Sequence, residues 1–266
     1  MKIIRNDNWQ NMNVEINIPL AVTIGKFEAL HLGHSHLINK TVEYAKEHNL
    51  ASAVLSFVPH PIQILADKNY KTMLSAEEQA FLLEKYGVDY WIPFPFDRDL
   101  AQMPPTEFCQ MLKEQMNCKA LLVGEGFHFG CNRTGTQATL QNLGKELNID
   151  IITVPTLHLN DNVSGGGKIS TSQIREYLTK GQIHEVNKLV GRPFLIMGKI
   201  NRSESGYKVY PAGDKLMPPD GEYSTPTGTV EVNTYCDDSG FKLRTVEVQE
   251  LDANIWDETL IVELTD

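Results

Sequence analysis

The sequence lacks the features typical of disulfide-rich, membrane-spanning, secreted and nucleic-acid-binding proteins. It has four cysteines, Cys109, Cys118, Cys131 and Cys236, and they show no paired spacing, which argues against a disulfide framework or a cysteine metal site. No apolar run approaches the roughly 20 residues of a membrane span, and residues 1–19 lack the apolar core of a signal peptide. Basic residues number 24 against 34 acidic ones, so no broad basic face for nucleic acid or a membrane surface is expected. We therefore expect a cytoplasmic protein whose partners are small molecules.

The remaining composition supports a folded protein with two kinds of architecture. Hydrophobic residues make up 41 % of the 266 residues, enough for a packed core. Apolar runs that end in glycine or proline alternate with segments of helical periodicity over the first 190 residues or so, which predicts an α/β domain with a parallel sheet covered by helices on both faces. The expected strands are 20–25, 51–57, 88–92, 119–123 and 150–154, and the expected helices are 34–48, 75–86, 105–116 and 137–147.

The second half of the chain changes character. Residues 160–168 have the composition of a mobile loop, and two short helices are expected near 170–178 and 183–190. A Gly-Arg-Pro sequence at Gly191 marks the predicted boundary between domains 1–190 and 191–266. The tail should form short strands at 194–200, 221–233, 241–249 and 260–264, which predicts a small all-β domain.

The first candidate site is the segment GKFEALHLGH, from Gly25 to His34, between a predicted strand and a predicted helix. A helix start offers backbone N–H groups and partial positive charge to an anion at the carboxyl end of a parallel strand. Gly25 and Gly33 would let a phosphate approach the backbone, and His31 and His34 would donate imidazole hydrogen bonds. Two ordinary surface histidines, or a metal site that includes His36, are the alternatives, and the metal site lacks carboxylate or thiolate ligands.

The second candidate site is KISTSQIR, which contains three successive hydroxyl side chains and then Arg175. Ser170 with Gln173 matches a capping box, so a helix cap alone would explain the pattern. The same residues could also grip phosphate oxygens, and Arg175 could neutralise charge on a leaving pyrophosphate.

Together these two segments resemble the HIGH-type nucleotidylyltransferase superfamily. FVPHP at Phe57 to Pro61 and GEGFHFGCNRTG at Gly124 to Gly135 narrow the resemblance to the adenylyltransferase module of bacterial bifunctional riboflavin kinase/FAD synthetases. The resemblance extends from about Val14 to Met197. It implies a Rossmann-like HIGH-type nucleotidylyltransferase fold and transfer of AMP from Mg-ATP to FMN, without a protein-held metal.

The resemblance also implies roles for individual residues. It assigns the chemistry to His31, His34 and Arg175, and ATP binding to Gly25, Phe27, Gly33, Ser170, Thr171 and Ser172. It assigns the flavin side to Phe57, Pro59, His60, Pro61, Phe127 and Phe129. Each phenylalanine could stack on an isoalloxazine or pack the core.

The chain departs from the family pattern at a few positions. Glu28-Ala29 stands where the family usually has Asp-Gly, so Ala29 must have a negative φ or be strained. Gly126 stands where Asn or Asp is frequent. The tail lacks the G-x-P-T-A-N segment expected of a riboflavin kinase near residues 203–214, has no convincing catalytic glutamate and is short, which predicts a degenerate, truncated kinase-like barrel.

The sequence therefore predicts an FMN adenylyltransferase that makes FAD and pyrophosphate and lacks riboflavin kinase activity. Two alternatives remain: an adenylyltransferase with another phosphate acceptor, such as a nicotinamide or pantetheine phosphate, and a flavin- or nucleotide-binding sensor that has lost catalysis.

Overall fold

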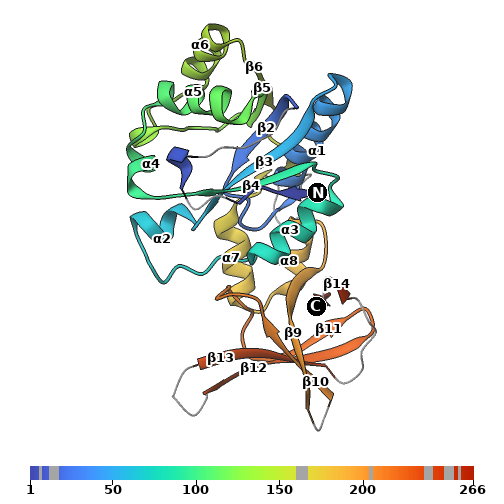
Figure 1. Cartoon of the computed structure of the whole chain (residues 1–266). Helices are drawn as coiled ribbons and strands as arrows, with labels where there is room; N and C mark the ends of the chain where they lie inside the picture. The colour runs from blue at the N-terminus through green and yellow to red at the C-terminus, as the bar shows by residue number, and fades with distance from the viewer. Residues whose placement is uncertain are drawn as a thin grey trace. The chain divides into compact units, whose positions relative to one another are not determined.

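The computed structural model (Figure 1) describes residues 1–5, 8–11, 18–159, 167–203, 206–236, 242–248, 255–256 and 259–266. Its internal contacts divide the chain into two compact units. The first comprises Met1–Phe27, Gly33–Tyr70 and Leu82–Leu157, and the second comprises Glu28–Leu32, Lys71–Phe81 and His158–Asp266. Two short segments from the first half of the sequence thus belong to the second unit. The predicted boundary at Gly191 stays a prediction.

The first unit is built on a six-stranded sheet in the order β1-β4-β3-β2-β5-β6. All adjacent strands are parallel, so the predicted α/β class is confirmed. The chain moves from β2 to β3 and β4 on one side, then returns to β5 on the other side of β2. Such a reversal is where open parallel sheets bind ligands, at the carboxyl ends of the strands. The strands are β1 Lys2–Ile3, β2 Leu20–Gly25, β3 Ala51–Val58, β4 Tyr90–Pro95, β5 Cys118–Gly124 and β6 Asp150–Val154.

Helices cover both faces of this sheet, as predicted (Figure 1). On one face, Leu37 and Ala45 of α1 pack with Ala21 of β2. On the other face, Val22 of β2 joins Phe108 of α5 and other helix residues in the largest apolar cluster. Alternate residues of one strand thus serve opposite faces, as the period of two requires. The helices are α1 Leu32–Glu47, α2 Pro61–Leu65, α3 Ala76–Lys85, α4 Arg98–Gln102, α5 Pro105–Met116 and α6 Gln137–Leu147, with short 3-10 turns η1 Trp9–Asn11 and η2 Cys131–Arg133.

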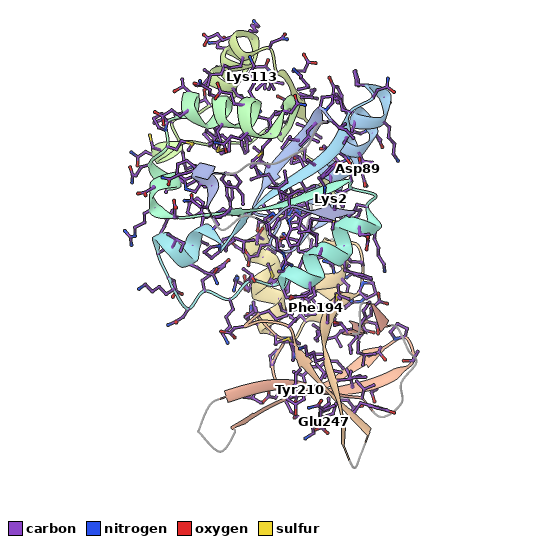
Figure 2. All side chains as sticks on the ribbon, in the orientation of Figure 1. Lys2, Asp89, Lys113, Phe194, Tyr210 and Glu247 are labelled. Atoms are coloured by element: carbon purple, nitrogen blue, oxygen red, sulfur yellow. The ribbon has the colours of Figure 1, made fainter. Side chains whose placement is uncertain are left out.

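Strand β4 differs from its prediction because it continues through two prolines. We expected it to end at Ile92 before a proline-rich turn, but it runs to Pro95. Its outer neighbour β1 pairs with it only at Tyr90 and Trp91, so Pro93 and Pro95 lie beyond that pairing, where a missing N–H costs nothing. At the start of the strand, Asp89 (Figure 2) accepts hydrogen bonds from the backbone nitrogen of Ser52 at 2.8 Å and its Oγ at 2.7 Å.

The second unit contains helices α7 and α8, the first part of α3 and an antiparallel sheet. The sheet order is β11-β12-β13-β10-β9-β15-β14, which confirms the all-β tail. Strand β11, the first in this order, also contacts the end of the chain. Ser224 N donates to Asp266 O at 3.1 Å, and Thr265 N donates to Ser224 O at 2.8 Å. The elements are β7 His158–Leu159, β8 Gly167–Lys168, α7 Thr171–Thr179, α8 Ile183–Val190, β9 Phe194–Ser203, β10 Gly206–Pro211, β11 Gly221–Thr225, β12 Gly228–Cys236, β13 Lys242–Val248, β14 Ile255–Trp256 and β15 Thr259–Leu264.

One tail prediction is wrong and one tail strand was not predicted. Residues 221–233 do not form a single strand. They form β11 and the first part of β12, which pair antiparallel across a turn at Pro226 and Thr227. Gly228 follows with a φ of 152°. Strand β10 was missed, although it pairs with both β9 and β13.

Two further observations bear on the sequence predictions. Most of the expected mobile loop, residues 160–166, lies outside the described residues, and its last two residues form β8, which pairs with β7. In the part of the chain that the structure describes, no helix is both long and apolar enough to span a membrane.

Candidate functional site

The segment after β2 carries the first set of predicted residues. Helix α1 begins at Leu32, so Gly33 and His34 lie in its first turn, where backbone N–H groups have no acceptor within the helix. The ring of Phe27 fills the space beside Gly25, since a Cβ on Gly25 would stand 2.9 Å from that ring. Phe27 also meets the His34 ring edge-on, with centroids 5.2 Å apart. Phe27 is fully buried and therefore shapes the loop and orients His34.

The backbone of this loop is strained at two bulky residues. Phe27 has a φ of 47° and Leu30 a φ of 44°, in the left-handed region that costs such residues on the order of 1–3 kcal/mol each. Both side chains are completely buried, and this burial holds the conformation. Ala29 does not have a positive φ, so the loop accommodates the absence of the family's glycine as predicted.

His31 lies just before the helix and is buried, with 8 % of its surface exposed. Burial lowers its pKa to about 4, a backbone hydrogen bond raises it less, and the nearby charge of Lys168 lowers it further. The imidazole is therefore neutral at pH 7 and can donate through one ring nitrogen only. The expected hydrogen-bond donor at this position is thus a neutral ring in the ligand-free protein.

The hydroxyl-rich segment begins helix α7, as predicted. Ser170 is the N-cap, and its Oγ accepts from Gln173 N at 3.2 Å, which confirms the forward half of the expected capping box. The Gln173 amide nitrogen donates to Tyr177 Oη at 3.4 Å. Ser170 and Ser172 are exposed and Thr171 is half-buried, so the hydroxyl groups of this segment are open to a ligand.

Arg175 makes a contact that the sequence did not predict. Its Nη2 donates to the Glu28 carboxylate and to the backbone oxygen of Lys71. Glu28 is almost fully buried, with 3 % of its side chain exposed, whereas 24 % of the Arg175 side chain is exposed. A buried carboxylate requires such a partner. Glu28, which replaces the family's usual aspartate, therefore fixes the guanidinium that we expected to meet pyrophosphate.

Two residues at the predicted domain boundary also hold the Glu28–Leu32 segment. Arg192 Nη2 donates to Ala29 O at 3.0 Å. Gly191 ends helix α8 with a φ of 72°, and a Cβ there would lie 2.3 Å from Leu32 Cδ2. The Gly-Arg-Pro sequence, which predicts a domain boundary, thus also supplies two residues that contact the Glu28–Leu32 segment.

The predicted flavin-side residues lie at the carboxyl end of β3 and just after the ends of β3 and β5. Phe57 is half-buried and packs edge-on to Phe96, with centroids 5.4 Å apart. Phe127 is half-buried and stacks on Phe129 at 5.6 Å. Phe129 itself is buried beside Phe108, so it packs the core. Phe96 was not predicted, and its position directly after β4 could have indicated it.

The PHP part of FVPHP forms a helix start. His60 is buried and is the N-cap of α2: its Nδ1 accepts from Ile62 N at 3.3 Å, and its backbone nitrogen donates to Gln63 Oε1 at 2.9 Å. Its ring stacks on Tyr70, with centroids 5.1 Å apart. Pro61 is the first helical residue, and Pro59 is exposed. His60 thus has a structural role, and its role toward a flavin stays a prediction.

The predicted residues therefore fall into two groups. Gly25, Phe27, Gly33, His34 and the flavin-side set belong to the first unit, whereas His31, Ser170, Thr171, Ser172 and Arg175 belong to the second. Within the second unit, Arg175 forms an ion pair with Glu28, which lies in the loop after β2 and is 147 residues away in sequence. That both groups hold one triphosphate stays a prediction.

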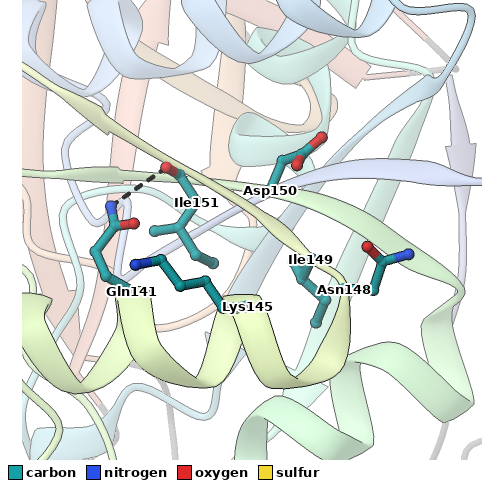
Figure 3. Close-up of a pocket in the computed structure, with 7 residues that line it drawn as sticks. Gln141, Lys145, Asn148, Ile149, Asp150 and Ile151 are labelled. Carbon is teal, nitrogen blue, oxygen red and sulfur yellow. Dashed lines mark hydrogen bonds between the residues drawn. The ribbon is translucent and has the colours of Figure 1, made fainter.

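A surface pocket lies elsewhere (Figure 3). It is lined by residues at the end of α6 and the start of β6, among them Lys145, Asn148 and Asp150, and Gln141 Nε2 donates to Ile151 O there at 3.3 Å. This is the amino end of a parallel strand, opposite to the end where such sheets bind ligands. We do not assign the candidate site to it.

Comparison with known proteins identifies the family to which this chain is related. The profile of the family described as FAD synthetase matches residues 14–170. The FAD synthetase of Listeria monocytogenes is 32 % identical over 213 residues, which are 79 % of this chain and 82 % of that protein. The bifunctional riboflavin kinase/FMN adenylyltransferase of Escherichia coli is 31 % identical over 202 residues, which are 75 % of this chain and 62 % of that longer protein. The crystal structure of a Streptococcus pneumoniae protein named macrolide-efflux protein has the same fold, with a TM-score of 0.76. The two chains are 22 % identical, and the match covers 100 % of this chain and 90 % of that one.

The parallel sheet, the loop after β2 and the matched segments define a nucleotidyltransferase. More specifically, the chain belongs to the FAD synthetase family.

Proposed function

We propose that this protein is an FMN adenylyltransferase that transfers AMP from ATP to FMN and has no riboflavin kinase activity. The observation that supports this most directly is the match to the FAD synthetase family over residues 14–170, the stretch that includes the loops after β2, β3 and β5. These loops follow the carboxyl ends of the strands around the reversal of strand order, where a nucleotide is expected in this class of sheet.

In the proposed reaction, an oxygen of the FMN phosphate attacks the α-phosphorus of ATP. A new phosphorus–oxygen bond forms, the bond from the α-phosphorus to the β-phosphate oxygen breaks, and pyrophosphate leaves with the electron pair. The second pKa of a phosphate monoester is near 6, so the nucleophile is mostly dianionic at neutral pH. No strong general base is then required, and catalysis depends on positioning and on charge stabilisation.

The residues present are suited to these two tasks. Backbone N–H groups at Gly33 and His34 and the exposed hydroxyls of Ser170 and Ser172 are donors for phosphate oxygens. Arg175, oriented by Glu28, is the cation for the leaving pyrophosphate. The half-buried faces of Phe57 and Phe127 are the candidates for contact with the isoalloxazine.

Magnesium would enter as part of the Mg-ATP substrate. Among the described residues, no three His, Cys, Asp or Glu side chains are grouped so as to hold a metal ion. Magnesium in nucleotide sites usually keeps several waters and binds substrate phosphates, which is the basis of this proposal.

The proposed absence of kinase activity rests on the tail. Residues 203–214 contain no G-x-P-T-A-N segment. Lys215, which directly follows, is buried against Glu78, so its ammonium is not open to a nucleotide.

The direct test is incubation of the chain with Mg-ATP and either FMN or riboflavin, followed by chromatography of the flavins. We expect FAD and equimolar pyrophosphate from FMN, and no FMN from riboflavin. FMN formed from riboflavin would contradict the proposed loss of the kinase. Pyrophosphate release with nicotinamide mononucleotide or phosphopantetheine, but not with FMN, would identify another acceptor. Tight binding of ATP and FMN without FAD would identify a sensor.

A further inference from the structure

A completely buried ion pair joins the β tail to helix α3. Lys215 Nζ lies 2.7 Å from both Glu78 carboxylate oxygens and donates to Leu195 O at 2.9 Å. The side chains are 1 % and 0 % exposed, and the ammonium also lies 4.7 Å from the centroid of the Phe194 ring. An apolar pair of similar volume would often be at least as stable in such a position. What the pair supplies is therefore a fixed local geometry, which its directional hydrogen bonds impose.

That geometry fixes a segment from the first half of the chain against the tail. Glu78 accepts hydrogen bonds from Met197 N of β9 at 2.8 Å and from Ser75 N at 2.9 Å. Leu216 N donates to Thr72 O at 2.7 Å. Lys215 and Leu216 thus hold both ends of residues 72–78, all of which belong to the second unit.

The held segment in turn supports Arg175. The backbone oxygen of Lys71, next to Thr72, accepts from Arg175 Nη2, the same nitrogen that donates to Glu28. Lys71 Nζ also pairs with Asp214 of the tail at 2.6 Å. A displacement of residues 71–72 would remove an acceptor that helps to orient the guanidinium.

We propose that Lys215 is a positioning residue for the adenylyl transfer: through Glu78 and the segment Lys71–Phe81, it holds Arg175 in the orientation that ATP requires. This inference rests on the proposed function and gives the β tail a role that does not involve riboflavin kinase chemistry. Burial lowers the pKa of Lys215, and the paired Glu78 carboxylate opposes that change.

The test is a double-mutant cycle with Lys215→Met and Arg175→Ala, measured as FAD formation at varied ATP. Lys215→Met should lower kcat/KM for ATP about tenfold, within the coupling range of residues in one network, and leave KM for FMN unchanged. In the Arg175→Ala background the same change should have less than about a twofold effect, because the group it positions is gone. Lys208→Met, which removes a partly exposed ion pair with Glu247 in the same sheet, is the matched control and should leave all constants unchanged.

A general loss of structure would behave differently. It would reduce activity by the same factor with or without Arg175, and that additive result would overturn the proposal, as would unchanged ATP kinetics in Lys215→Met. The variant Glu78→Gln/Lys215→Met leaves no buried charge unpaired and should show the same non-additivity with Arg175→Ala. If neither variant folds, the pair is required for the fold and the positioning role is refuted.

Failure of the proposed function would be visible separately. If the unaltered protein forms no FAD, the same cycle is measured as ATP affinity by calorimetry. Coupling between Lys215 and Arg175 in ATP affinity would then support the positioning role without the reaction, and independent effects would reject it.

Discussion

The burial of His31 predicts a specific loss of stability in mild acid. Its pKa is lowered from 6.5 to about 4, mainly by burial, so between these values the unfolded chain binds a proton that the folded protein does not. The neutral imidazole therefore contributes stability that is fully present above pH 6.5 and is lost as the pH falls toward 4. Linkage between pH 7 and pH 5 gives a loss of about 2 kcal/mol from this one residue.

Urea unfolding of the unaltered protein and of His31→Gln at the two pH values would measure this loss. Glutamine does not titrate, so the variant should lose about 2 kcal/mol less stability between pH 7 and pH 5. His48→Gln, at an exposed position just after α1, is the control and should keep the pH dependence of the unaltered protein. The histidine resonance that disappears in His31→Gln identifies the residue for direct titration by NMR.

Two results would refute the reasoning. One is a His31 resonance that titrates near 6.5, which would mean that the imidazole is not desolvated. The other is an unchanged pH dependence in His31→Gln. A bound triphosphate should favour the protonated ring, so the same resonance should shift to a higher pKa when ATP is added if His31 meets the phosphates as the sequence predicts.

Three further changes test the site and its supports. His34→Ala, which removes the imidazole predicted to donate to a phosphate oxygen, should raise the barrier by about 2–4 kcal/mol, seen as a drop in kcat for pyrophosphate release at saturating ATP and FMN; full turnover would remove the imidazole from the reaction. Glu28→Ala should cost about 1.5–3 kcal/mol in urea unfolding because it removes a charge-assisted hydrogen bond to Arg175, whereas Glu176→Gln, at an exposed helical pair with Lys180, should leave stability unchanged. Gly191→Ala should cost about 3 kcal/mol, from a φ of 72° and a Cβ placed 2.3 Å from Leu32. Gly87→Ala has a similar φ of 74° but open space and should cost only about 1–2 kcal/mol; equal costs would show that the Leu32 contact is unimportant.

Hydrophobic periodicity and bounding glycines or prolines predicted correctly those elements whose limits are set by residues within or next to the segment. Helix 105–116 begins at a proline and strand 20–25 ends at a glycine, and the structure has the same limits. Strand β10 was missed although GYKVYP begins with a glycine and ends with a proline, because so short a segment becomes a strand only through its pairing with β9 and β13. The extension of β4 through Pro93 depends on where β1 stops pairing, which is a property of the sheet and not of the segment.

The candidate site shows the same division between local and distant information. The capping role of Ser170 follows from four adjacent residues and was predicted. The Glu28–Arg175 pair joins residues 147 positions apart, and no periodicity connects them. The neutral state of His31 likewise depends on burial by other segments, so the sequence could nominate the imidazole but not its charge.

The tail gives a physical reason why such a domain would persist without kinase activity. A buried lysine and its carboxylate partner must be retained together, because removing one leaves a charge unpaired in the core at a cost of about 3–5 kcal/mol. Lys215 and Glu78 are such a pair, and Arg192 adds a bond from the start of the tail to the backbone of Ala29. These contacts lie at β9 and at the loop after β10, whereas β12 and β13 make none of them. A tail under this constraint alone should therefore tolerate substitution at exposed positions of β12, such as Thr229 and Glu231, and show reduced adenylyl transfer on substitution at Lys215 or Arg192.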